Sequence, residues 1–130
     1  MRDLKEESIS TIELFRSCSP AQIRQVARLG DWVDVAEGTV LATEGERARE
    51  FVVILDGTAA ATDTDGMSML EPGSFYGQVE LAGDCAHHST VHMLTAGRLL
   101  VFEARAFRLL IESIPSVAWK LMSELARASA

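Results

Sequence analysis

The segment that decides the fold is Gly73 to Val91, which reads GSFYGQVELAGDCAHHSTV. Its pattern predicts the end of a strand, a tight turn at Gly77, a short helix, a polar loop and the start of another strand. The first turn of a helix has backbone N–H groups without acceptors inside the helix, and such groups attract anions. The segment therefore predicts a cradle for a phosphate or another anion between two strands.

Short strands separated by glycine turns are expected on both sides of this segment. Apolar residues either alternate with polar ones or form β-branched runs such as Phe51 to Leu55, and both patterns predict strands. Asp56-Gly57 and Asp65-Gly66 are dipeptides typical of hairpin turns. About eight short strands at this spacing predict a β-sandwich or a barrel-like roll. The expected strands are 32–35, 39–43, 51–55, 58–62, 67–70, 90–94 and 99–102, together with the strand end before Gly77.

Helices are expected before these strands. Residues 4–15 place apolar side chains on one helical face, and a second helix is expected over 20–29. Ser19 and Gln22 form a Ser-x-x-Gln capping box for the second helix. Gly30 suits the left-handed position that commonly ends a helix.

Helices are also expected after the strands. The helical period returns over 104–114, and a last helix begins at Pro115. Val117, Leu121 and Leu125 recur every four residues on one side of that helix. The simpler interpretation of this apolar stripe is that it packs against the strands.

Length and composition predict one compact domain. The 130 residues are 48% apolar and 24% charged, which suffices for one hydrophobic core but not for two. We expect a single domain over 1–130, divided into N-terminal helices (4–29), a β-roll (31–103) and C-terminal helices (104–128).

Charge and hydropathy argue against several classes of function. The formal net charge of -7 argues against a nucleic-acid partner, which requires clustered Lys and Arg, and against an anionic membrane surface. The N-terminus lacks the apolar segment of a secretory signal, and no apolar run is long enough to span a bilayer. Cys18 and Cys85 are expected to be free thiols. We therefore expect a cytoplasmic protein that binds neither nucleic acid nor membrane.

The order of elements resembles the cyclic-nucleotide-binding domain shared by catabolite activator proteins, protein kinase A regulatory subunits and cyclic-nucleotide-gated channels. The resemblance is carried by Leu14-Phe15 followed by Ser19-Pro20, by the turn glycines Gly38 and Gly45, and by the strand and turn of residues 51–57. It implies a mainly β fold with flanking α-helices, an eight-stranded β-roll of jelly-roll type. It also implies a regulatory domain that is not an enzyme and needs no cofactor or metal.

The resemblance further implies a ligand site in residues 76–89, called here the cassette. The family's cassette runs Phe-Gly-Glu, a small residue on a short helix, and then Arg-Ser/Thr-Ala; the glutamate binds the ribose and the arginine binds the cyclic phosphate. In this chain Gln78 stands at the glutamate, Glu80 at the small residue and His87 at the arginine. The site residues implied by the match are Tyr76, Gly77, Gln78, Val79, Glu80, His87, His88 and Ser89.

These departures predict weak or absent binding of cAMP and cGMP. Loss of a charge-assisted hydrogen bond from arginine costs about 1.5–3 kcal/mol. A Glu80 carboxylate about 5 Å from a phosphate would add roughly 3 kcal/mol of repulsion at an effective dielectric of about 20. Together these terms predict an affinity roughly three to four decades below that of an intact cassette.

Three functional hypotheses follow. The first is a stand-alone regulatory or interaction module with a degenerate cassette. The second is a true cyclic-nucleotide or other small-ligand sensor, in which protonated imidazoles replace the missing arginine at acid pH. The third is a metal-dependent enzyme that uses Asp84, Cys85, His87, His88 and His92, although their spacing matches no compact ligand motif.

The resemblance gives the last helix a second interpretation. It is similar to the C-terminal helix of the family, which carries the dimer contact in transcription regulators. Under this interpretation Val117, Leu121 and Leu125 form a homodimer interface, because their spacing suits a helix-to-helix contact. The domain is then expected to act through a homodimer or through another protein partner.

Overall fold

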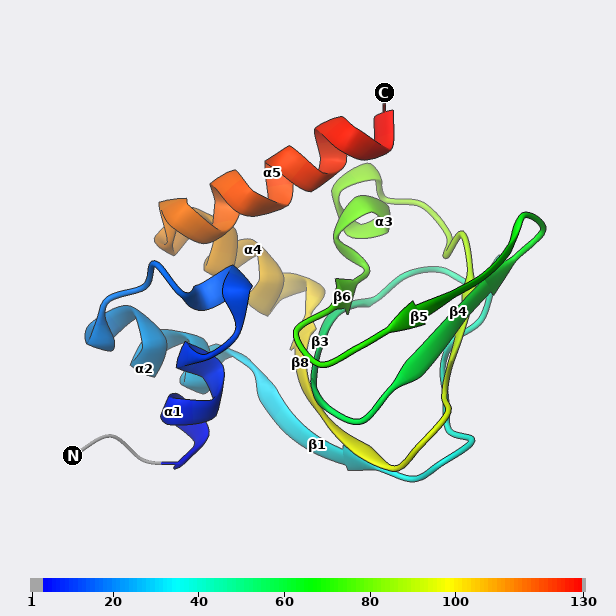
Figure 1. The fold of residues 1–130 in the computed structure, drawn as a ribbon. Helices are drawn as coiled ribbons and strands as arrows, with labels where there is room; N and C mark the ends of the chain where they lie inside the picture. Colours follow the sequence, from blue (N-terminus) through cyan, green and yellow to red (C-terminus); the bar gives the residue numbers. More distant parts are fainter. Residues whose placement is uncertain (1–3, 130) are drawn as a thin grey trace.

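The computed structural model describes residues 4–129, with side chains described to residue 123. Eight strands form two four-stranded sheets, flanked by helices at both ends of the sequence, as predicted (Figure 1). The helices are α1 (Leu4–Ser10), the 3-10 helix η1 (Glu13–Phe15), α2 (Pro20–Leu29), α3 (Gln78–Gly83), α4 (Ala104–Ser113) and α5 (Pro115–Ser129). The strands are β1 (Asp31–Val35), β2 (Val40–Ala42), β3 (Glu50–Asp56), β4 (Ala59–Asp63), β5 (Gly66–Leu70), β6 (Phe75–Tyr76), β7 (Thr90–Met93) and β8 (Gly97–Glu103).

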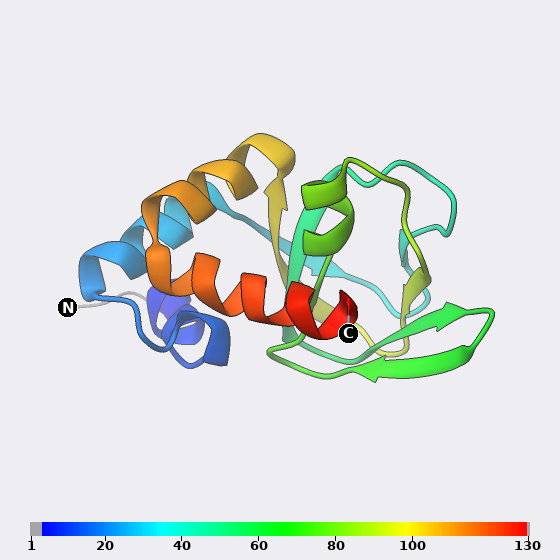
Figure 2. The same ribbon diagram turned by 90° about the horizontal axis from the view of Figure 1, so that it is seen from above.

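The two sheets form a roll that is antiparallel throughout its recorded pairings. One sheet has the order β1-β8-β3-β6 and the other has the order β2-β7-β4-β5. Figures 1 and 2 show α1, α2 and α4 gathered on one side of the roll, whereas α3 lies at the end of β6. No helix within residues 4–129 is both long enough and apolar enough to cross a membrane.

The fully apolar run in β3 faces a different core on each side. Phe51 and Val53 belong to a cluster with the helices, whereas Val52 and Ile54 belong to a cluster between the sheets. The ring of Phe51 lies 4.9 Å from that of Phe107 in α4, measured between centroids. Because successive side chains of a strand point to opposite faces, a strand between two cores needs apolar residues throughout.

The N-terminal helices differ from prediction in two details. The first helix ends at Ser10, because the hydroxyls of Ser10 and Thr11 donate to the carbonyls of Glu7 and Ser8 and so compete with the helical pattern. Gly30 has φ -94°, so it is not left-handed. It is small for a packing reason instead: a Cβ there would lie 2.7 Å from Cδ1 of Leu100.

The predicted dimer residues on α5 pack inside the chain. Val117 and Leu121 are 0% and 2% exposed, in the same cluster as Phe15 and Leu110. The homodimer interpretation was therefore wrong for these two residues, because the helices bury them. The side chain of Leu125 lies outside the described part of the structure.

Candidate functional site

The cassette begins at a turn that only glycine fits. β6 pairs with β3, placing Tyr76 opposite Val52, and the chain then turns sharply at Gly77 with φ 101°. A Cβ on Gly77 would collide with the carbonyl oxygen of Glu50. Both the backbone angle and the close approach therefore require glycine.

The helix α3 carries three predicted site residues in its first turn. The N–H of Leu81 donates to the carbonyl of Gly77 at 3.0 Å, which is the first hydrogen bond of the helix. The N–H groups of residues 78–80 therefore have no acceptor within the helix. The Oε1 atom of Gln78 is buried and has no hydrogen-bond partner among the described residues. It is thus an acceptor that a donor on a ligand can satisfy.

Glu80 and His88 form an ion-pair geometry across the cassette. Nδ1 of His88 lies 3.1 Å from Oε1 of Glu80, although the two residues come from the helix and from the loop that follows it. The Glu80 side chain is only 14% exposed, whereas that of His88 is 65% exposed. The carboxylate therefore sits in the first turn of α3, where the N-terminal end of a helix favours negative charge.

His87 lies beside Tyr76 rather than beside Glu80. The ring centroids of Tyr76 and His87 are 6.4 Å apart, in an edge arrangement. Burial, and secondarily the carboxylate of Glu50, raise the pKa of the Tyr76 phenol well above its usual value. The two neighbouring histidines thus have different partners, and Ser89 follows them, half-buried, before β7 begins.

The loop after α3 is held by a segment that the sequence did not connect with it. The N–H of His87 donates to the carbonyl of Glu46 at 2.8 Å, and Arg47 forms a bridge with Ala86. Nη2 of Arg47 lies 2.7 Å from Oδ1 of Asp84. Arg47 was missed because its position beside the cassette depends on pairing between distant segments, and the sequence carries no local signal of that pairing.

The metal-site hypothesis finds no cluster to support it. Within residues 4–129, no group of three or more His, Cys, Asp or Glu side chains is arranged to hold a metal ion. Cys85 is exposed, and His92 lies on β7 opposite Val40 and Ala60. Cys18 and Cys85 are both free thiols.

The chain is an antiparallel β-roll with a glycine turn and a short helix between β6 and β7. The model of the family "cyclic nucleotide-binding domain" matches residues 32–113, which is more than half of the chain. The chain therefore belongs to the cyclic nucleotide-binding domain family.

Relatives of this chain come from several kinds of protein. A cyclic nucleotide-gated potassium channel of Mesorhizobium japonicum is 24% identical over 110 residues, which cover 85% of this chain and 31% of the channel. The catabolite activator protein of Thermus thermophilus has a TM-score of 0.78 at 20% identity, covering 88% of this chain and 57% of that one. A cyclic nucleotide-binding-like protein of Brucella abortus has a TM-score of 0.67 at 22% identity, covering 85% of this chain and 100% of that one. These two structural likenesses confirm the fold.

Proposed function

We propose that this domain is a non-enzymatic regulatory or interaction module whose cassette binds cyclic nucleotides weakly or not at all at neutral pH. The observation that carries the proposal is the pairing of Glu80 with His88 at 3.1 Å. The carboxylate of Glu80 is largely buried in the first turn of α3, so the chain supplies its own anion there. A ligand phosphate about 5 Å away would meet roughly 3 kcal/mol of repulsion at an effective dielectric of about 20.

The cations near the cassette support the same proposal. His87 occupies the position of the phosphate-binding arginine, and its ring lies against Tyr76. Imidazole lacks the permanent charge and the two-pronged donor geometry of a guanidinium. Arg47, which comes close to the loop, is already paired with Asp84 at 2.7 Å. Neither group replaces the missing arginine while those contacts persist.

A non-enzymatic, regulatory role is also supported by the relatives. Their names describe a gated channel and an activator protein, and the domain shares its fold with the activator. The chain spans about a third of the channel and about half of the activator chain. The activities of those whole proteins are therefore not assigned to this chain. A module of this kind acts by changing a partner rather than a substrate.

We place the interaction surface of the module on the exposed side of α5. Trp119 and Met122 are 70% and 60% exposed there, whereas Val117 and Leu121 on the opposite side are buried. Large apolar side chains on one helical face are common at protein–protein contacts. The proposed occupant is a second copy of this chain.

One observation favours the second candidate, a weak small-ligand sensor. The buried Oε1 atom of Gln78 has no partner in the part of the chain that the structure describes, and leaving such an acceptor unpaired costs about 1–3 kcal/mol. A ligand hydroxyl would supply the missing donor. Under this candidate, acid pH strengthens binding of an anionic ligand, because imidazole side chains are the groups that gain charge between neutral and mildly acid pH.

Calorimetric titration with cAMP separates these candidates. The module proposal predicts no saturable heat up to about 1 mM cAMP at either about pH 7.5 or about pH 5.5. The sensor candidate predicts saturable binding that is at least about tenfold stronger at the acid pH. Binding with a Kd of about 10 µM or below at the neutral pH would overturn the module proposal.

A further inference from the structure

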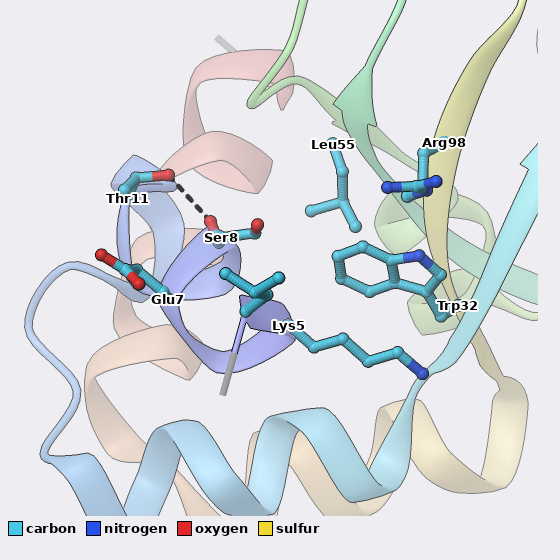
Figure 3. A pocket seen from close by; sticks show the side chains of 8 residues that line it. Lys5, Glu7, Ser8, Thr11, Trp32, Leu55 and Arg98 are labelled. Carbon is cyan, nitrogen blue, oxygen red and sulfur yellow. Dashed lines mark hydrogen bonds between the residues drawn. The ribbon is translucent and has the colours of Figure 1, made fainter. Parts of the chain in front are cut away.

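A cavity lies away from the cassette, on other elements of the fold. It has a volume of about 740 Å³ and lies between α1 and the strands β1, β3 and β8. Its lining includes the side chains of Lys5, Ser8, Thr11, Trp32, Leu55 and Arg98 (Figure 3). Small-molecule sites in proteins commonly have volumes of about 300–1,000 Å³, so this cavity has room for a ligand.

The indole of Trp32 is the organising group of this cavity. The Cζ atom of Arg98 lies 5.3 Å from the centroid of the Trp32 ring, and Nζ of Lys5 lies 5.6 Å from it. Figure 3 shows the ring between these two side chains, with Ser8 on α1 and Thr11, just after α1, across the cavity. Cations at these distances interact favourably with an indole ring and hold its orientation.

Two of the polar groups remain able to bind a ligand. Arg98 is held in place by Asp34, its cross-strand neighbour, through a bond of 2.6 Å from Nε to Oδ1. This bond uses Nε and leaves the Nη groups to face other acceptors. The exposed Lys5 ammonium contacts the Trp32 ring. The hydroxyl of Thr11, by contrast, is already bonded to the carbonyl of Ser8.

We propose that this cavity is a binding site for a small organic monoanion with an aromatic body, such as an aromatic carboxylate. The body packs on Leu55 and on the part of the Trp32 ring that the two cations leave open, and the carboxylate lies near Lys5 and Arg98. The chain has a formal net charge of -7, whereas two cations contact one aromatic ring here. The cavity therefore has a local positive charge that the chain as a whole lacks. Glu7 also lines the cavity and Asp34 adjoins it, and these carboxylates disfavour a ligand with several negative charges.

The test follows the two indole N–H signals of the nitrogen-labelled protein by NMR. The chain has two tryptophans, Trp32 and Trp119, and a Trp119→Phe variant assigns their signals. We expect 2-naphthoate to shift the Trp32 signal saturably, with a Kd of about 1 mM or tighter. The Trp119 signal stays in place and serves as an internal control.

Three matched probes and two variants test whether binding needs both the aromatic ring and the negative charge of the ligand. We expect the neutral analogue 2-naphthylmethanol and the ring-free anion acetate each to bind at least about fivefold more weakly than 2-naphthoate. Lys5→Gln and Arg98→Gln should each weaken 2-naphthoate binding by a similar factor. Arg24→Gln, which changes an exposed arginine on α2, should leave the Kd unchanged.

Several outcomes would overturn the proposal. One is the absence of any saturable shift of the Trp32 signal up to about 10 mM 2-naphthoate. Another is an equal shift of both indole signals, which indicates non-specific adsorption. A third is binding that Lys5→Gln leaves unchanged, since Lys5 is exposed and its replacement disturbs no buried contact. Retention of the circular dichroism spectrum shows that each variant is folded.

Discussion

Gly77 is the residue on which the position of the cassette depends. Its φ of 101° is unfavourable for any other residue, and a Cβ would also collide with the carbonyl of Glu50. We predict that Gly77→Ala lowers the free energy of unfolding by at least about 2 kcal/mol, measured by urea denaturation.

Gly38 offers a matched control for this substitution. It has φ 85°, but nothing lies within 4 Å of the position that a Cβ would take. Gly38→Ala therefore meets the backbone cost alone, about 1 kcal/mol. Equal losses of stability in the two variants would contradict the close approach of Gly77 to β3.

Tyr76 is the only tyrosine in the chain, so its ionisation can be followed without interference. Burial, and then the carboxylate of Glu50, raise the pKa of its phenol. The folded state keeps this proton above about pH 10, where the unfolded chain loses it. The stabilising contribution of this group is therefore complete below about pH 10 and is lost as the pH rises further.

We predict that the ultraviolet absorbance of tyrosinate does not appear near about pH 10 while the protein remains folded. Above that pH, the wild type should lose about 1.4 kcal/mol of stability per pH unit relative to Tyr76→Phe, measured by urea denaturation at each pH. A tyrosinate signal with a midpoint at about pH 10 in the folded protein would contradict the burial of this phenol.

The sequence was sufficient to predict the turn, the short helix and the loop of the cassette in order. It was not sufficient to predict which side chains of the cassette contact each other. The turn at Gly77 follows from local backbone requirements, and those are visible in a sequence. The contact between Glu80 and His88 depends on how the loop after α3 folds back, and the position of Arg47 depends on a bridge to Ala86. Such contacts between distant segments have no local pattern.

At the scale of elements, predictions were accurate where local chemistry decides the structure. The capping box of Ser19 and Gln22 is present in both directions, and α2 has the predicted bounds. The first helix was predicted too long, because hydroxyl groups at Ser10 and Thr11 compete for carbonyls. Two of the residues predicted to form an interface on α5 are buried within the chain, because an apolar stripe does not reveal whether it meets its own chain or another.

The packing of α5 provides a direct test at this scale. Leu121 is 2% exposed and its neighbour Met122 is 60% exposed. We predict that Leu121→Ala lowers the free energy of unfolding by about 2–5 kcal/mol, because it leaves a cavity in the core. Met122→Ala should cost no more than about 0.5 kcal/mol. Similar losses in both variants would contradict the described orientation of the helix.

At the scale of the whole molecule, the exposed side of α5 is our proposed contact between copies. We predict that the chain self-associates reversibly and that Trp119→Glu weakens the association at least about tenfold, measured by sedimentation equilibrium. Arg24→Glu, on another exposed helix, is the control for added negative charge. A wild-type protein that remains monomeric up to about 1 mM would contradict this contact.

The whole molecule has the β-roll of its family. We propose that the charged groups of its cassette are unsuited to a cyclic phosphate. Our central claim is that the cassette retains a suitable shape and lacks suitable charge. The unpaired Oε1 atom of Gln78 supports retention of the shape, and the Glu80–His88 pair supports the change of charge.

The most direct measurement is calorimetric titration of the double variant Glu80→Gln/His87→Arg with cAMP at about pH 7.5. This variant removes the internal carboxylate and restores a guanidinium, and Glu37→Gln controls for the loss of an exposed carboxylate elsewhere. We predict saturable binding with a Kd of about 10 µM or tighter, whereas the wild type shows no saturable heat up to about 1 mM cAMP. A folded double variant without saturable heat up to about 1 mM cAMP would contradict our account, because the shape of the cassette would then be at fault.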